Sequence, residues 1–266
     1  MHISYNFTNF ASNLVTMINY LPLIAALIPA IALLVYIYWH DRHSPEPVSQ
    51  LLKATFYGVL SILVSFCISY PLGWLGFYVS EPSTIMQSIG YAFFGAAVPE
   101  ELAKLFMLWI FLRKNKYFDE HLDGIVYAVC VSLGFAGLEN VLYVTQDTEW
   151  LSTAILRAVT SVPGHFCFAV AMGYFYSLVT FSSINRKRNL LLLFVTPIML
   201  HGIYDSILFI TTTYLPNWAN VILLLVFAYF CFRMWKGAYR TIKTLAFSDH
   251  LNSIKIFDDA TDNNQP

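Results

Sequence analysis

Charged side chains are scarce in this 266-residue chain, at 12%, whereas 58% of its residues are hydrophobic. Soluble globular chains carry roughly 25% charged and roughly 45–50% apolar residues. The mean hydropathy of +0.59 therefore excludes an ordinary soluble domain. The sequence also lacks the basic stripe that a nucleic-acid-binding surface requires, so no nucleic-acid partner is expected. This composition predicts a polytopic membrane protein.

Several motifs of hydrolases and metal sites are absent as well. The four cysteines stand singly in apolar runs without C-x-x-C spacing, so neither a disulfide framework nor a cysteine zinc site is indicated. The sequence contains no H-E-x-x-H, no G-x-G-D and no G-x-S-x-G. These absences disfavour a site-2 type metalloprotease, an aspartyl pair and a serine nucleophile.

Apolar runs alternate with short polar loops along the whole chain. Runs near the ~20 residues needed to cross a bilayer predict seven helices, at about 20–39, 51–74, 87–112, 122–144, 152–181, 190–212 and 216–236. Lys and Arg residues gather in alternate loops, which places the N-terminus outside and the C-terminus in the cytoplasm. We therefore predict an all-α, polytopic membrane helix bundle in the cytoplasmic membrane.

The predicted domain organisation follows from these spans. Residues 1–240 are expected to form one transmembrane domain with its core at about residues 35–210. Residues 241–266 are expected to form a cytoplasmic tail that is partly disordered, because its end is rich in Asp and Asn.

Ionisable side chains inside the predicted spans lie at one depth. With a rise of about 1.5 Å per residue, four spans place such groups near the midplane of the hydrocarbon core. They are Glu100, Glu101 and Lys104 in the third span, Glu139 beside Asn140 in the fourth, Arg157 and His165 in the fifth, and His201 and Asp205 in the sixth. Each charge at that depth costs about 2.5–3.5 kcal/mol even on lenient insertion scales. The coincidence of depth therefore indicates a functional site.

The spacing of these residues suggests pairs within single helices. Glu100 and Lys104 are four residues apart, so they share a helix face and can form an ion pair. His201 and Asp205 have the same spacing, which suits either two ligands of one metal or a carboxylate that orients an imidazole. Pro99 removes one backbone hydrogen bond just before Glu100 and is expected to loosen or kink that helix.

The charge balance of the cluster raises the question of a metal. Four acids face only Lys104 and the shallower Arg157, so either some carboxyls are protonated or a divalent cation is bound. His165, His201 and Glu139 are the candidate ligands, and zinc suits such N and O donors. Arg157 itself is expected to reach for the outer membrane interface.

Three motifs now occur in a recognisable order. Residues Glu100–Lys104 fit the pattern E-E-x-x-K, and Phe135–Asn140 fit F-x-x-x-E-N. His165 and the segment His201–Asp205 follow them. In this order the chain resembles the PrsW family of intramembrane proteases over roughly residues 35–210. That family is related to the CAAX-processing and bacteriocin-processing membrane peptidases.

The resemblance implies hydrolysis of a peptide bond within or next to the bilayer. The substrate would be a membrane-anchored protein in the same lipid bilayer, for example an anti-sigma factor or similar regulator that undergoes site-1 cleavage. The implied enzyme is a glutamate- and histidine-dependent peptidase, with a zinc metalloprotease as one form.

The mechanism follows as a hypothesis. One glutamate of the pair, Glu100 or Glu101, acts as general base on a water molecule. His165 and His201 hold that water, directly or through one divalent metal, for which zinc is the first choice. The supporting roles are as follows: Asn140 donates to the developing oxyanion, Lys104 keeps one glutamate ionised, Asp205 orients His201, and Glu139 is a metal ligand or a second acid.

Two other classes of protein fit the same buried charges. A transporter or a proton or cation channel would use the carboxylates as a relay. A catalytically silent membrane scaffold would lose only stability when Glu100 or His201 is replaced. Flux in liposomes and tolerance of substitution at one glutamate would mark a transporter.

Overall fold

The structure is a computed structural model that describes residues 2–42, 44–211 and 215–262. Within these ranges the chain forms nine α-helices and one π-helix and contains no strand, which confirms the all-α class. The elements are α1 (His2–His40), α2 (Val48–Trp74), α3 (Ile85–Gly90), η1 (Tyr91–Ala97), α4 (Val98–Leu112), α5 (His121–Gln146), α6 (Trp150–Val159), α7 (Ser161–Phe181), α8 (Arg186–Thr211) and α9 (Asn217–Asp262).

Six helical segments of the described chain are long and apolar enough to cross a membrane. They are Tyr20–His40, Val48–Trp74, His121–Gln146, Trp150–Phe181, Arg186–Thr211 and Asn217–Leu251. The remaining predicted span, at 87–112, is helical too, but it is divided among α3, η1 and α4. The polytopic helix bundle is therefore confirmed, with its third span built from three consecutive helical pieces.

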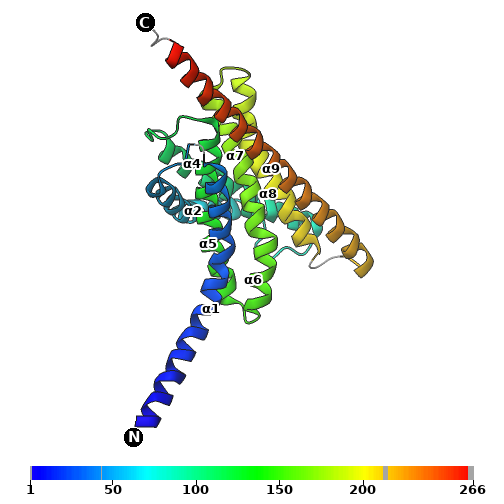
Figure 1. The fold of residues 1–266 in the computed structure, drawn as a ribbon. Coiled ribbons are helices and arrows are strands. Elements are labelled where there is room, and N and C mark those ends of the chain that lie inside the picture. The colour runs from blue at the N-terminus through cyan, green and yellow to red at the C-terminus, as the bar shows by residue number, and fades with distance from the viewer. Residues whose placement is uncertain (1, 43, 212–214, 263–266) are drawn as a thin grey trace.

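Helix α5 lies at the centre of the bundle, as Figure 1 shows, and packs against α7, α2 and α1. Its side chains are buried almost without interruption from Leu122 to Gly137. Small residues allow this close packing. A Cβ atom at Gly134 would overlap the backbone carbonyl of Thr55 on α2, and one at Gly173 on α7 would overlap the carbonyl of Gly124. These contacts fix the depth of α5 relative to both neighbours.

The helix around Pro99 is irregular, as its sequence predicts. Pro99 has no N–H to donate to the carbonyl four residues earlier, that of Gly95. The hydroxyl of Ser69 on α2 donates to this carbonyl instead, at 3.1 Å. The turns just before Pro99 form the π-helix η1, and α4 begins at Val98. The catalytic candidates of α4 thus follow directly on a segment of non-α geometry.

The fifth predicted span is broken in the middle, which the sequence-based prediction of one helix at 152–181 did not include. Helix α6 ends at Val159 and α7 begins at Ser161, with Thr160 between them at φ −121° and ψ −69°. Pro163 explains the break, because its ring would clash with the carbonyl of Val159 in a continuous helix. The break places the N-terminus of α7 inside the bundle, one turn before His165.

The C-terminal helix is longer than predicted. We expected the last span to end near residue 236, but α9 continues without a break to Asp262 and crosses Figure 1 diagonally. Ile242 is fully buried, and the carboxylate of Asp249 accepts the backbone N–H of Leu122 at 2.9 Å. This part of the expected tail therefore packs against the start of α5. The domain division at residue 240 stays a prediction, and residues 263–266 lie outside the described chain.

Candidate active site

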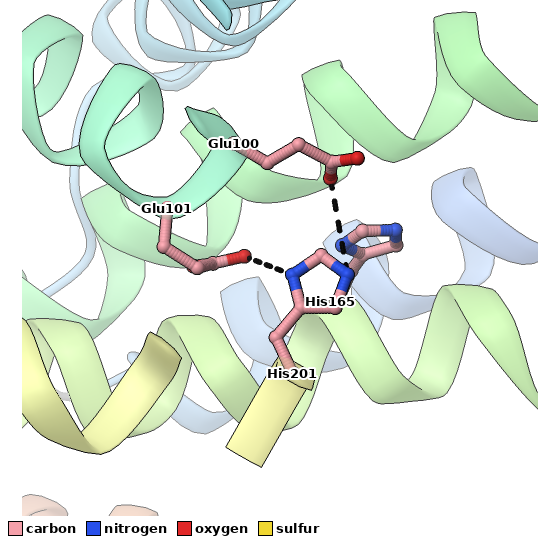
Figure 2. Close-up of side chains that lie close together, drawn as sticks. All are labelled: Glu100, Glu101, His165 and His201. Carbon is pink, nitrogen blue, oxygen red and sulfur yellow. Dashed lines mark hydrogen bonds and ion pairs between the residues drawn. The ribbon is translucent and has the colours of Figure 1, made fainter. Parts of the chain in front are cut away.

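Three helices bring four of the predicted site residues together. Glu100 and Glu101 extend from α4 toward His165 on α7 and His201 on α8 (Figure 2). One potential ligand atom from each of the four side chains lies within 4.8 Å of the others. The coincidence of depth in the sequence thus corresponds to real proximity in the fold.

Lys104 lies at the centre of this cluster and is 0% exposed. Its Nζ donates to Oε1 of Glu101 at 2.9 Å and to Oε2 of Glu100 at 3.2 Å. The same Nζ lies 3.1 Å from Nδ1 of His165 and 4.0 Å from the centre of the Phe135 ring. All three ammonium protons therefore have a partner, as a fully buried lysine requires.

The contacts of His165 assign its tautomer. An ammonium group has only donors, so Nδ1 of His165 must accept from Lys104 and its ring proton belongs on Nε2. That Nε2 lies 3.2 Å from Oε2 of Glu139 and donates to it. The hydroxyl of Ser132 also donates to the His165 backbone carbonyl at 3.0 Å. His165 is thus a neutral imidazole with a fixed orientation.

His201 has a different environment, because carboxylates face both of its ring nitrogens. Nδ1 lies 2.9 Å from Oε1 of Glu101, and Nε2 lies 3.2 Å from Oδ2 of Asp205. The ring stacks on Phe168 with 4.8 Å between the ring centres. Two carboxylate partners suit an imidazolium, in which both nitrogens donate. The predicted role of Asp205, to orient His201, agrees with this geometry.

The two adjacent glutamates face different surroundings. The Glu100 side chain is 14% exposed and lines a cavity of about 700 Å³, whereas Glu101 is 1% exposed and does not line it. Oε2 of Glu101 is buried and has no hydrogen-bond partner in the described part of the chain. The other acidic, basic and histidine residues that line the cavity are Glu139, Arg157, His165, His201 and Asp205. Of the adjacent pair, Glu100 is therefore the one that borders the cavity.

Asn140 and Arg157 have positions that the sequence analysis did not foresee. Asn140 is 0% exposed; its Nδ2 donates to the carbonyl of Ala26 on α1, and its Oδ1 accepts from Nε of Arg157, each at 2.6 Å. The guanidinium also donates to Oε2 of Glu139 at 2.6 Å. One N–H and the Oδ1 of Asn140 are thus used inside the protein, and Asn140 does not line the cavity. Arg157 points inward to the site, not to the outer interface.

The comparison with known families agrees with this arrangement. Residues 46–233 match the family described as PrsW family intramembrane metalloprotease, a range that includes every residue of the site. The chain belongs to the PrsW family. This PrsW-family protein is therefore an intramembrane protease and an integral membrane protein, and the resemblance found in its motifs is confirmed.

Relatives of this PrsW-family protein share most of its length. Protease PrsW of Geobacillus kaustophilus is 33% identical over 219 residues, which cover 82% of this chain and 89% of that protein. Protease PrsW of Bacillus subtilis is 34% identical over 220 residues, or 82% of this chain and 93% of that protein. Protease PrsW of Oceanobacillus iheyensis is 37% identical over 184 residues, or 69% and 81%. No solved structure matches the chain.

The donor set of this PrsW-family site fits a divalent cation. Two carboxylates and two imidazoles lie close enough to share one ion, and the orphaned Oε2 of Glu101 supplies a lone pair without a partner. The sequence placed Glu139 in the metal set, but Oε2 of this side chain is engaged by Arg157, and Glu100 and Glu101 group with the histidines instead. To hold a cation, His201 would have to release a ring proton and the ammonium of Lys104 would have to leave Nδ1 of His165.

Arg157 is the residue whose partners the sequence analysis missed. The sequence did contain a sign of the pairing between Arg157 and Glu139. Glu139 needed a cation at its own depth, and Lys104 was already assigned to Glu100. The sequence analysis expected one continuous helix over 152–181 and therefore did not include the break at Thr160, which separates α6 from α7.

Proposed function

We propose that this PrsW-family protease cleaves a membrane-anchored protein by using Glu100 as the general base. The observation that carries this proposal is the pair formed by Oε2 of Glu100 and Nε2 of His201. These atoms lie 4.0 Å apart, too far for a direct hydrogen bond, and both residues line the cavity. A water molecule at an ordinary hydrogen-bond distance of about 2.8 Å from each atom bridges such a gap.

The proposed reaction is a direct hydrolysis. Glu100 takes a proton from the bridging water as the water oxygen attacks the carbonyl carbon of the scissile bond. The Nε2–H of His201, which otherwise pairs with Asp205, would turn part of this hydrogen bond to the attacked oxygen and stabilise the negative charge that develops there. The protonated Glu100 then gives its proton to the leaving nitrogen, which completes hydrolysis into an acid and an amine.

The neighbouring residues hold these two groups in position. Glu101 contacts both Lys104 and His201, so it fixes the distance between α4 and α8. The ammonium of Lys104 favours the ionised form of Glu100, which is the form a base needs. The pair of Glu139 and Arg157 fixes His165, and Asn140 anchors Arg157 to α1.

A divalent cation, with zinc as the proposed identity, would be held by Glu100, Glu101, His165 and His201. Bound there, it would supply Lewis-acid chemistry to the water and to the substrate carbonyl. This assignment replaces Glu139 of the sequence-based set with the two glutamates of α4.

The substrate is proposed to reach the site from the outer face. The cavity extends to Tyr70 and Ser80 near the loop between α2 and α3, and that loop contains no Lys or Arg. With the N-terminus outside, as the positive-inside rule indicates, this loop faces the exterior. A single-span regulator such as an anti-sigma factor, cut close to its outer membrane boundary, suits this geometry. Membrane proteomics of wild-type and Glu100→Ala cells would find the substrate as a protein that stays full length only in the mutant.

The proposed chemistry is tested by measuring turnover of a single-span test substrate by the purified protein in liposomes. Glu100→Gln keeps the side-chain shape but removes the base, so turnover should fall by about 10²–10⁴-fold. Glu81→Gln changes an exposed carboxyl on the outer loop and should leave turnover unchanged. Full activity in Glu100→Gln would end the scheme.

The metal is tested separately on the same preparation. Bound zinc is measured per mole of protein, and turnover is compared before and after treatment with a chelator. Loss of activity that added zinc restores is the expected result. A metal-free preparation with undiminished turnover would reject the metal and leave glutamate chemistry alone.

A further inference from the structure

The exposed residues that line the active-site cavity all lie on one side of it. Every cavity residue on η1, α4, α7 and α8 is buried or half-buried by the surrounding protein. The cavity residues that are exposed belong to α2, α5, α6 and the loop after α2, and they are Phe66, Tyr70, Ser80, Leu142, Tyr143 and Leu156. A side chain that lines a cavity and is also uncovered lies at the rim of that cavity. The cavity therefore opens between α2 and the pair formed by α5 and α6.

The opening widens along α2 from the point where this helix touches α5. At that point a Cβ atom on Gly58 would overlap the carbonyl oxygen of Val131, so the two backbones are in contact. The cavity residues of α2 share one helix face, as their spacing shows, and they are Ile62, Ser65, Phe66, Ser69 and Tyr70. Along that face Ile62 is 5% exposed, Phe66 61% and Tyr70 83%. The protein thus covers this face less and less toward the end of α2.

Helix α5 shows the same gradient on its own side of the opening. Its cavity residues also share one helix face, and they are Phe135, Glu139, Leu142 and Tyr143. Phe135 is 3% exposed, whereas Tyr143, about two turns later, is 55% exposed. The two faces are therefore closed where Gly58 meets α5 and open toward the ends of both helices. This opening is named the α2–α5 portal, and its rim consists of Phe66, Tyr70, Leu142 and Tyr143.

The portal connects the bilayer with the catalytic candidates. Helices α2 and α5 are both long and apolar enough to cross a membrane, and no rim side chain is charged. Behind the rim, the same cavity is lined by Glu100, His165 and His201. The Tyr143 ring lies 4.1 Å from the guanidinium of Arg157, so the rim borders directly on the ionic groups of the site. An apolar segment at the rim would thus stand next to the polar groups that could hydrolyse it.

Small side chains on the cavity wall allow another helix to approach closely. In a bilayer, close van der Waals packing at small residues drives helix association, because lipid is as apolar as the helices themselves. Ser65 and Ser69 on α2 and Gly95 on η1 line the cavity. The Ser65 hydroxyl donates to the carbonyl of Ile62 at 2.8 Å, and that of Ser69 to the carbonyl of Gly95 at 3.1 Å. Both hydroxyl protons are thus used inside the protein, and the wall suits an apolar partner.

We propose that the transmembrane helix of the substrate enters the cavity sideways from the bilayer, through the α2–α5 portal. The assignment rests on the proposed function and names the route by which its substrate arrives. Entry of part of the span from the water side, past Ser80, would first expose its apolar side chains to water. Sideways entry keeps the span in lipid throughout. The cavity of about 700 Å³ has the size of a site for a small ligand, so only a few substrate residues enter it while the rest of the helix stays at the rim.

Photo-crosslinking locates the substrate helix directly. Benzoylphenylalanine replaces Phe66 in Glu100→Gln, which should bind substrate without cleaving it, and a single-span test substrate is reconstituted in the same liposomes. Phe56 is the matched control position, because it is the same residue type on the same helix, is 58% exposed and does not line the cavity. The substrate should form an adduct at position 66 that an excess of unlabelled substrate removes, and no such adduct at position 56. Equal adducts at the two positions, or lipid adducts only at position 66, would overturn the assignment.

A bulky thiol label tests whether the portal must be open for turnover. Phe66→Cys is labelled with a benzophenone maleimide in a Cys67→Ala background, because Cys67 is the exposed cysteine of the chain. Compared with the same variant before labelling, turnover of the single-span substrate should fall to the fraction of protein that is unlabelled. The same label on Phe56→Cys should leave turnover unchanged. Full turnover of completely labelled Phe66→Cys would overturn the assignment.

Failure of this proposal and failure of the proposed function give different results. If the wild type does not cleave the test substrate, the proposed function fails, and an adduct confined to position 66 still supports the portal. If the wild type cleaves the substrate but positions 66 and 56 behave alike in both experiments, the portal fails and the proposed function stands.

Discussion

Replacing Lys104 with methionine tests how the buried charges of the site depend on one another. Methionine has a similar length and no charge, so the variant keeps most of the packing and removes only the ammonium. Two carboxylates then lose a partner at 2.9 Å and 3.2 Å, and His165 loses the donor to its Nδ1. The Glu101 carboxylate suffers most, because it is 1% exposed whereas Glu100 borders the cavity.

The expected cost is large for a membrane protein of this size. Breaking a buried ion pair by removing one partner costs about 3–5 kcal/mol, because the remaining charge stays in a medium that solvates it poorly. That corresponds to a change of about a hundred- to a few thousand-fold in the unfolding equilibrium. Adding Glu101→Gln removes the stranded charge, so the double variant should recover at least half of the loss. Neither variant should cleave substrate.

Equilibrium unfolding in mixed detergent micelles, followed by tryptophan fluorescence, measures these differences. Lys53→Met is the control, because Lys53 is exposed on α2 and its replacement should change stability by less than about 0.5 kcal/mol. A loss below about 1 kcal/mol in Lys104→Met, or a double variant no more stable than the single one, would refute the idea that the ammonium compensates the buried charge of Glu101.

Further predictions concern packing and pH. Gly134→Ala should destabilise the protein, because the new methyl group overlaps a backbone carbonyl of α2. Gly237→Ala on α9, where no atom lies within 4 Å of the new methyl group, should be neutral or stabilising by up to about 1 kcal/mol. The same unfolding assay compares the two variants. Burial raises the pKa of Asp41, in the loop after α1, to about 7, and burial also raises the pKa of Glu46. Because these folded-state pKa values exceed the unfolded ones, stability should be highest below about pH 4 for this pair and fall as the pH rises toward 7. Asp41→Asn should flatten that slope in unfolding curves recorded between these pH values.

The depth of the site could be predicted from the sequence, because helix rise fixes how far each residue lies from a membrane boundary. Glu100, Lys104, His165 and His201 were expected at one level, and the fold brings them into contact. Helical periodicity also predicted the ion pair of Glu100 with Lys104, because residues four apart share a helix face independently of how the helices pack.

Helix rotation could not be predicted in the same way. A sequence pattern does not say which of two adjacent glutamates faces the cavity, because that depends on how α4 packs against α8. Asn140 turns toward α1 and Arg157 toward Glu139 for the same reason. Pro163 could have indicated the break at Thr160, but the prediction used hydropathy alone, which does not separate the two helices.

The π-helix η1 determines the directions in which Glu100 and Glu101 of α4 face. An α-helix turns by about 100° per residue, and a π-helical segment accommodates an extra residue per turn within the same axial length. Deleting one residue of η1 would therefore swing α4 by roughly the angle between neighbouring side chains. Glu101 would then take the place of Glu100 beside the cavity, and Glu100 would take the buried place of Pro99. Which of the two glutamates borders the cavity therefore depends on the helical register that η1 sets, one turn before Glu100.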